Sequence, residues 1–155
     1  MNNIITPRQV ADLAFAAGEY LDPEAILEAD IAAAQHRYIE PVTGRALAEA
    51  LAQGRYDDFR DRYAAPALAM WVRVMVQPVM DIRTGPAGSV VQRTASAAPA
   101  GDNARAASIA ALRQRARQLL RRMSGELERM AAQMPEYDPD SNILAKRRIE
   151  GGIVL

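Results

Sequence analysis

The sequence predicts an all-α protein, a small bundle of about five helices. The chain is 50% hydrophobic with much alanine, aromatic residues make up only 5%, and Gly and Pro fall mostly between the apolar segments. Alanine is the best helix former, whereas sandwiches and barrels are rich in aromatic and β-branched residues. A length of 155 residues fits one domain.

The first two helices are predicted from their start and stop signals. Thr6 and Gln9 form a capping box around a proline at the first helical position, and Gly18 is the expected stop. A second helix is expected over residues 22–40, because Asp-Pro opens it and the residue before Pro41 disfavours the helical conformation.

A short third helix and a central fourth helix should follow the turn at 42–44. Gly54 is the expected stop of the third helix. The fourth begins near Tyr56 and carries apolar residues on more than one face, so we expect it to be the core helix. Pro66 should bend it, and Pro78 should kink or end it. The inward residues of the third helix are expected to be Leu47 and Leu51.

The most apolar run, residues 64–80, is not predicted to cross a membrane. It is short and contains Arg73, Gln77 and two prolines, whereas a membrane span needs about 20 apolar residues. The chain start has no basic region followed by an apolar core, so no signal peptide is expected. We therefore expect no membrane partner.

Residues 81–101 are predicted to form a long loop or a short β-hairpin. The stretch at 89–92 suits a strand that pairs with 81–83, and residues 84–101 are rich in Ala, Ser, Gly, Thr and Pro. A loop this long in a compact domain is functional or a flexible linker, and the sequence leaves both possibilities open.

A long amphipathic helix is predicted from Asp102 or Asn103, both good caps, to Met134. At 1.5 Å per residue it would span about 48 Å, longer than a small domain is wide. Its apolar stripe follows a three-four spacing that suits packing against other helices. The stripe consists of Ile109, Leu112, Ala116, Leu119, Met123, Leu127, Met130 and Met134.

Charge is unevenly distributed although the formal net charge is zero. Residues 1–60 hold ten acids and five arginines, whereas residues 61–134 hold five acids and eleven arginines. These opposite charges meet either within one monomer or between neighbouring subunits, and the sequence does not decide which. A pI of about 6.6 lacks the usual electrostatic signature of nucleic-acid binding.

No catalytic, cofactor-binding or metal-binding residue is predicted, and the chain is not expected to be an enzyme. The absence of cysteine excludes disulfides, thiolate zinc sites and a cysteine nucleophile. His36 is the single histidine and lacks a second ligand at metal-binding spacing. The acids near Asp57 match no calcium loop and suit the start of a helix. No glycines have the spacing of a phosphate-binding loop.

Residues 135–155 are predicted to form an extended arm beyond a helical domain at 1–134. The arm carries Lys146-Arg147-Arg148 and ends in Ile153-Val154-Leu155 after two glycines. Such a tip can add a strand to a neighbour or enter its apolar pockets, although a frayed end is the alternative. The predicted partner-binding residues are Arg113, Arg117, Arg121, Arg147, Arg148, Ile153, Val154 and Leu155.

The run IAAAQHRYIEPVTGRAL at residues 31–47 resembles the "helix, aromatic, Ile, turn, Gly" signature of head–tail connector (adaptor) proteins of tailed bacteriophages. It is especially similar to versions in phages and prophages of Bacteroidetes-like hosts. The proline-containing apolar helix at 56–80 and the strand-like excursion at 81–91 extend the similarity. The resemblance is one of pattern and covers most of residues 4–134.

This resemblance implies a structural virion protein with no catalytic residues or cofactors. Many copies, often twelve by analogy with the family, would form a ring beneath the portal and extend the DNA channel towards the tail. The implied partners are other copies of the chain, the portal protein, a tail or second connector protein, and packaged double-stranded DNA passing without sequence-specific contact. The implied location is the head–tail interface of a virion assembled in the bacterial host cytoplasm. The alternative function is a DNA-binding or regulatory helical protein that uses the arginine-rich helix.

Overall fold

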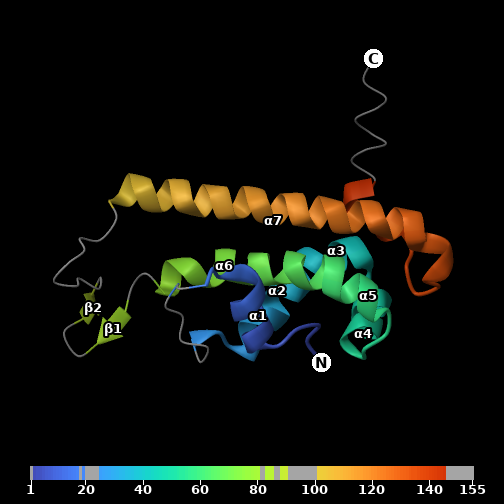
Figure 1. Ribbon diagram of the computed structural model, residues 1–155, viewed down its shortest axis with the longest axis horizontal. Helices are drawn as coiled ribbons and strands as arrows, with labels where there is room; N and C mark the ends of the chain where they lie inside the picture. Colours follow the sequence, from blue (N-terminus) through green and yellow to red (C-terminus); the bar gives the residue numbers. More distant parts are fainter. Residues whose placement is uncertain are drawn as a thin grey trace, which may run out of the picture.

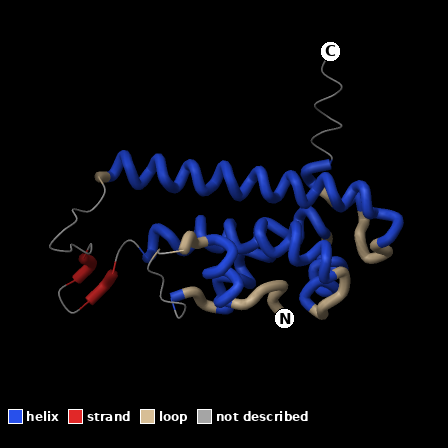
Figure 2. Tube along the Cα trace, in the orientation of Figure 1, coloured by secondary structure: helices blue, strands red, loops and turns tan. Residues whose placement is uncertain are grey.

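Helix α6 (Ala65–Met80) is the centre of an all-α bundle, as the sequence predicted. The computed structural model describes residues 2–17, 19, 25–80, 83–85, 88–90 and 101–145. Helices α1 and α2 pack against α6, and the long helix α7 packs against it as well. Figure 1 shows α6 between α7 and the N-terminal segment, and Figure 2 shows that helices dominate the described chain. The buried residues of α6 are Ala65, Ala67, Leu68, Ala69, Met70, Trp71, Val72, Val74 and Val76.

Helix α1 (Pro7–Ala14) begins at the predicted capping box. The Oγ1 of Thr6 accepts a hydrogen bond from the backbone N of Gln9 at 3.3 Å, and Oε1 of Gln9 accepts one from the backbone N of Thr6 at 2.9 Å. The helix ends at Ala14, before Gly18, which lies outside the described residues. It ends early because Phe15 adopts an extended conformation and packs against the guanidinium of Arg73, 4.3 Å from the ring centroid.

The predicted end of the second helix at Pro41 is wrong. Helix α2 (Glu28–Ala34) continues through a π-helical turn (Gln35–Ile39) into α3 (Glu40–Thr43). Within the π turn, the backbone N of Glu40 donates to the carbonyl of Gln35, five residues earlier. The wider turn absorbs the proline, which lacks a donor and would otherwise clash with the carbonyl four residues before it. The predicted start at residue 22 lies outside the described residues.

Pro66 is accommodated in the same way. The short helix α5 (Asp57–Phe59) runs through a second π turn (Arg60–Ala64) into α6. Pro41 is the second residue of α3, and Pro66 is the second residue of α6. Both prolines therefore follow a π turn directly, which the apolar pattern of the sequence does not reveal. Pro78 lies inside α6 near its end at Met80.

The predicted third helix is α4 (Arg45–Ala52), between two glycines with positive φ. Gly44 has φ 75° and Gly54 has φ 81°, a region that glycine adopts at no steric cost. Leu47 and Leu51 are fully buried, as expected.

Helix α7 (Asp102–Met130) and a 3-10 turn (Ala131–Gln133) form the predicted long helix. Its N-cap is Gly101 rather than Asp102 or Asn103, and the cap makes no side-chain hydrogen bond. The apolar stripe is buried only in its C-terminal part, since α7 has no buried residue before position 116. Ile109, Leu112, Leu119 and Met130 are half-buried. The buried residues of α7 are Ala116, Leu120, Met123, Ser124 and Leu127.

The segment at 81–101 contains a short hairpin, but its strands are 83–85 and 88–90 rather than the predicted 81–83 and 89–92. Strands β1 (Arg83–Gly85) and β2 (Gly88–Val90) pair in antiparallel register, with Arg83 opposite Val90. The predicted flexibility of residues 84–101 concerns positions that lie mostly outside the described residues.

The first half of the predicted C-terminal arm is not extended. Tyr137 and Asn142 are buried, and a 3-10 turn (Pro139–Ser141) contacts α3. The arm folds back here because Asn142 satisfies its polar groups against α7. Residues 146–155, with the predicted basic and aliphatic partner-binding residues, lie outside the described part of the chain.

Candidate interaction surfaces

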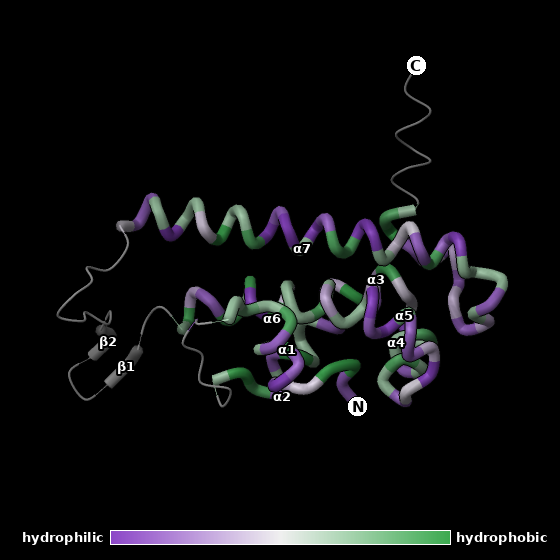
Figure 3. Tube along the Cα trace, in the orientation of Figure 1, coloured by the Kyte–Doolittle hydropathy of each residue, from purple (hydrophilic) through white to green (hydrophobic). Residues whose placement is uncertain are grey.

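One flank of α7 carries three exposed arginines, Arg113, Arg117 and Arg121. They are spaced four residues apart, so they lie on one side of the helix at steps of about 6 Å. None of the three forms an ion pair with another described residue. Figure 3 shows hydrophilic residues recurring along the outer length of α7. We call these three residues, which the sequence analysis predicted to be partner-binding residues, the α7 arginine flank.

The positive charge of this flank is uncompensated for a reason visible in the sequence. Between Asp102 and Glu126 the helix contains no acid. Glu126 pairs with Arg129 at 3.1 Å, and Glu128 accepts hydrogen bonds from the C-terminal segment. No carboxylate of α7 is therefore left at helical spacing from the flank.

The acidic first half of the chain does not neutralise the flank within one copy. Among the described residues, two ion pairs join residues 1–60 to residues 61–134. The pair between Arg60 and Asp61 links neighbours in the sequence. The other connects Glu19 to Arg73 at 2.9 Å. Arg122 on another side of α7 lies over the ring of Tyr63, 5.3 Å from its centroid. Within the described chain, therefore, no ion pair joins the acidic first half to an arginine of α7.

A buried polar cluster fixes the C-terminal segment on α7. Nδ2 of Asn142 lies 2.9 Å from Oγ of Ser124, 2.8 Å from Oη of Tyr137 and 3.2 Å from Oε1 of Glu128. The hydroxyl of Tyr137 also donates to Glu128. Burial, together with this bond to Glu128, raises the pKa of Tyr137 to about 12. The sequence search missed Asn142, because a single asparagine in a polar segment carries no distinguishing pattern.

A second contact holds the same segment against the turn after α4. Glu136 accepts a hydrogen bond from Oη of Tyr56 at 2.6 Å and pairs with Arg55. The bond from Tyr56 lowers the pKa of Glu136, and it raises the pKa of Tyr56. Tyr56 has φ 58°, a left-handed conformation that is unusual for a bulky residue. Together with Asn142, Glu136 holds the described C-terminal segment against the bundle.

Incompletely buried apolar residues lie on the last turns of α6 and in the first half of α7. Val79 is 72% exposed, and Met75, Met80, Ile109 and Leu112 are half-buried. We call these five residues the α6–α7 strip. Arg105 and Arg113 of α7 lie beside its helical positions, so the strip is an apolar surface in a basic setting.

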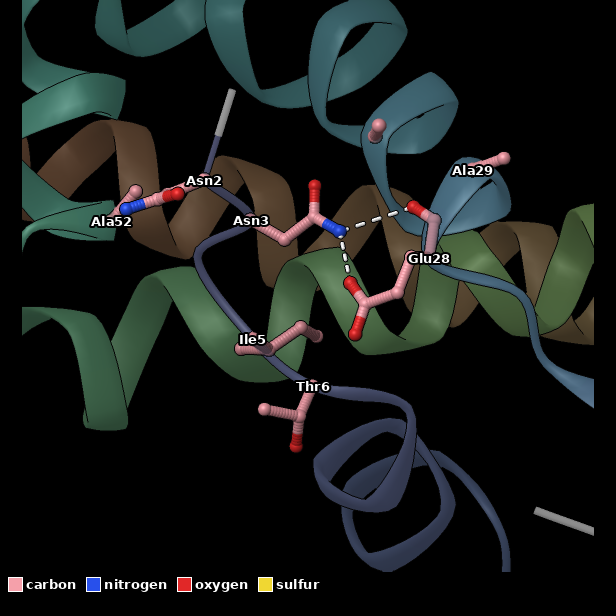
Figure 4. Close-up of a pocket in the computed structure, with 8 residues that line it drawn as sticks. Asn2, Asn3, Ile5, Thr6, Glu28, Ala29 and Ala52 are labelled. Carbon is pink, nitrogen blue, oxygen red and sulfur yellow. Dashed lines mark hydrogen bonds between the residues drawn. The ribbon is translucent and has the colours of Figure 1, made fainter. Parts of the chain in front are cut away.

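A shallow hollow of about 610 Å³ opens beside the N-terminal segment. Nδ2 of Asn3 donates to the backbone carbonyl of Glu28 at 3.0 Å and to its carboxylate, and Figure 4 shows both bonds joining the N-terminal segment to the start of α2 among the lining residues. No sequence pattern marks this hollow, because its lining comes from three separate segments. We call it the N-terminal hollow, and it is lined by Asn2, Asn3, Ile5, Thr6, Glu28, Ala29, Ala32 and Ala52.

The residues considered for metal or acid–base chemistry form structural contacts. Nδ1 of His36 lies 2.8 Å from Oε2 of Glu40, and the His36 side chain is 80% exposed. Asp57 and Asp61 both pair with Arg60. The described residues contain no group of three or more His, Asp or Glu side chains arranged to hold a metal ion. Within the same part of the chain, no helix is long and apolar enough to cross a membrane.

Comparison with known proteins assigns most of the chain to one family. The model of a family described as "Family of unknown function (DUF6712)" matches residues 26–147, which span α2 through α7 and the segment anchored by Asn142. No curated protein and no solved structure matches the chain.

Proposed function

We propose that this chain, which belongs to the DUF6712 family of unknown function, is a head–tail connector of a tailed-phage virion. In this proposal many copies form a ring between portal and tail that extends the DNA channel. By analogy with the connector family, we expect twelve copies. The observation that carries the proposal is the α7 arginine flank, whose charge has no partner within the described chain. An uncompensated basic flank opposite an acidic first half favours contact with a second copy.

A ring requires two different surfaces on each subunit. Helix α7, which carries the arginine flank, lies on one side of α6, and the N-terminal segment, which lines the hollow, lies on the other (Figure 1). Unlike surfaces on opposite sides of a subunit generate head-to-tail contacts, which close into a ring when the rotation between copies is suitable.

The connector class itself rests on the resemblance at residues 31–47. That run begins within α2, continues through the first π turn, α3 and the Gly44 turn, and ends in the first turn of α4. The proposed partners are further copies, the portal protein, a tail or second connector protein, and passing double-stranded DNA. The proposed location is the head–tail interface of the virion.

Native mass spectrometry and electron microscopy of the purified protein test this proposal. We expect a closed ring that dissociates when the flank is reversed in the triple variant Arg113→Glu/Arg117→Glu/Arg121→Glu. The matched control, Arg8→Glu/Arg62→Glu/Arg115→Glu, reverses the same number of charges at exposed arginines outside the flank that form no ion pair with another described residue, and it should leave the ring intact. A wild-type protein that remains a monomer at all accessible concentrations would contradict the proposal.

The alternative function, DNA binding by the arginine-rich helix, is favoured by the same flank. Its steps of about 6 Å suit repeated phosphate contacts. In that case the affinity for duplex DNA should fall steeply as the salt concentration rises. The slope of log affinity against log salt concentration should be shallower in the flank-reversed variant. No DNA binding at low salt by a ring-forming protein would remove this alternative.

A further inference from the structure

We propose that the α7 arginine flank of one copy docks on the N-terminal hollow of the next copy, where one of its guanidinium groups pairs with Glu28. This inference rests on the proposed ring and names one of its contacts. It joins two surfaces of the described chain. One is a basic side of a helix, and the other is a polar hollow that contains a carboxylate.

The two surfaces lie in stretches of opposite charge. Residues 103–125 hold six arginines and no acid, whereas residues 20–36, which include the start of α2, hold four acids and no lysine or arginine. Within the described chain, Glu28 forms no ion pair, and neither does any arginine of the flank. Each surface therefore keeps its charge for a partner of the opposite sign.

The hollow has the acceptors that a guanidinium group requires. Four of its eight lining residues are polar, namely Asn2, Asn3, Thr6 and Glu28. The bond from Asn3 occupies one carboxylate oxygen, Oε2 of Glu28, and a carboxylate can accept several hydrogen bonds. Arginine presents five N–H donors in a planar fork that matches a carboxylate, and side-chain oxygens of Asn2 and Thr6 can accept the remaining ones.

The flank and the hollow of one copy cannot meet. Helix α7 packs on one side of α6, and the N-terminal segment that lines the hollow lies on the other side (Figure 1). A helix with its side chains is about 10–12 Å across, which is farther than one arginine side chain extends. Both surfaces belong to elements packed around the same helix, so folding fixes their separation. Contact between them requires a second copy.

This contact can repeat from copy to copy. Each copy offers one flank and one hollow on opposite sides, so a bound pair still has one free surface of each kind. Such head-to-tail contacts close into a ring when the rotation between copies is suitable. The same interaction would therefore serve every subunit of the proposed ring.

Site-directed cross-linking of the full-length protein tests the proposal, because the chain contains no cysteine. One variant carries Ala29→Cys, at an exposed residue of the hollow, and the second carries Ala110→Cys, about one turn before the flank on the same side of α7. The two variants are expressed together and treated with a short bismaleimide. We expect a covalent dimer with one copy of each, identified by mass spectrometry of the linked peptides.

The matched control for Ala110→Cys is Ala111→Cys. This neighbouring alanine is also exposed, but it lies about 100° further around α7, away from the flank. Its cross-linking to Ala29→Cys should be several-fold weaker. Neither cysteine replaces a flank arginine or Glu28, so the proposed contact stays intact in both experiments.

The outcomes separate this inference from the proposed function. A ring by mass with equal cross-linking from Ala110→Cys and Ala111→Cys would overturn the inference and leave the connector proposal standing. A double variant, Ala29→Cys/Ala110→Cys, that cross-links only within single chains would also overturn the inference. A specific cross-link in a protein that forms only dimers would support the inference and contradict the ring.

Removing the charge of Glu28 gives a second readout. Glu28→Gln keeps a side-chain oxygen for the bond from Asn3 but loses the charge, so it should lower the yield of the Ala29–Ala110 cross-link several-fold. Asp58→Asn removes one exposed negative charge outside the hollow that has no ion-pair partner among the described residues. It should leave the yield unchanged. Equal losses from the two substitutions would overturn the assignment of Glu28.

Charge exchange identifies the partner of Glu28. Glu28→Lys and the flank-reversed variant Arg113→Glu/Arg117→Glu/Arg121→Glu should each lower the cross-link yield several-fold. Combining them should recover much of the yield, because the contact is re-formed with reversed signs. A combined variant that yields no more cross-link than either parent would show that the flank does not recognise Glu28, and the inference would be wrong.

Discussion

Nδ2 of Asn142 lies 2.9 Å from Oγ of Ser124, and both side chains are buried between α7 and the C-terminal segment. Oδ1 of Asn142 also accepts from the backbone N of Leu144 at 2.9 Å. One side chain thus connects the long helix to the chain that follows it. The relationship fixes the described C-terminal segment on α7.

Replacing Asn142 with Ala should destabilise the protein by about 1–3 kcal/mol, because the buried hydroxyl oxygens of Ser124 and Tyr137 lose this donor. Urea denaturation followed by circular dichroism measures this change. Asp140→Ala, at an exposed position of the same segment, should stay within about 0.5 kcal/mol of wild type. Equal effects of the two substitutions would mean that the buried cluster contributes nothing.

Arg73 should be the side chain that holds the end of α1 against α6. Nη1 of Arg73 donates to the carbonyl of Ala14 at 2.5 Å, and Nη2 donates to Glu19 at 2.9 Å. Arg73→Met keeps much of the packing volume but leaves the carbonyl of Ala14 without this donor, so we expect a loss of about 1–3 kcal/mol in thermal or urea unfolding. The same substitution at Arg117, which has no ion-pair partner among the described residues, should be nearly neutral.

The Glu19–Arg73 pair should contribute to stability only above acidic pH. The hydrogen bond from Arg73 lowers the folded-state pKa of Glu19 below its usual value of 4.5. Folding therefore favours the ionised carboxylate, and this stabilisation is present above pH 4.5 and is lost as the pH falls through the lowered folded-state pKa. The difference in unfolding free energy between wild type and Glu19→Gln should shrink over that interval. A difference that does not change with pH would contradict the assignment.

The contribution of Tyr137 to folding stability should be lost at alkaline pH. Its folded-state pKa is raised from 10 to about 12, so folding favours the neutral phenol. The contribution is complete below pH 10 and is lost as the pH rises from 10 towards 12, because the unfolded chain ionises first. Wild type and Tyr137→Phe should therefore converge in stability over this interval. Tyrosinate absorbance should show one of the five tyrosines ionising last.

Two glycine-to-alanine substitutions should have opposite signs. Gly44 has φ 75°, and an added Cβ would lie 3.4 Å from Oγ of Ser141, so Gly44→Ala should destabilise by about 1–3 kcal/mol. Gly125 is inside α7 with no other atom within 4 Å of an added Cβ, and Gly125→Ala should stabilise by about 1 kcal/mol. Urea midpoints of both variants, measured with wild type, check the two signs. Destabilisation by Gly125→Ala would indicate a close neighbour on that side of α7.

Local signals in the sequence predicted much of the fold. The capping box at Thr6, the glycine turns at 44 and 54 and the central apolar helix all depend on residues a few positions apart, and the structure contains each of them. The arginine flank follows from four-residue spacing in the same way. The sequence did not predict the two π turns, since a proline within a helical pattern also indicates a helix end.

The sequence by itself determined the helical fold class, the helix-forming segments and the spacing of the α7 arginines. Only the tertiary structure decided that α7 is buried in its C-terminal part alone, that Asn142 anchors the following segment, and that Asn3, Glu28 and Ala52 line one hollow. The physical reason is range: caps, turns and helix faces depend on neighbours within a few residues. Burial depth, buried polar partners and surface hollows depend instead on which distant segments the packing brings together.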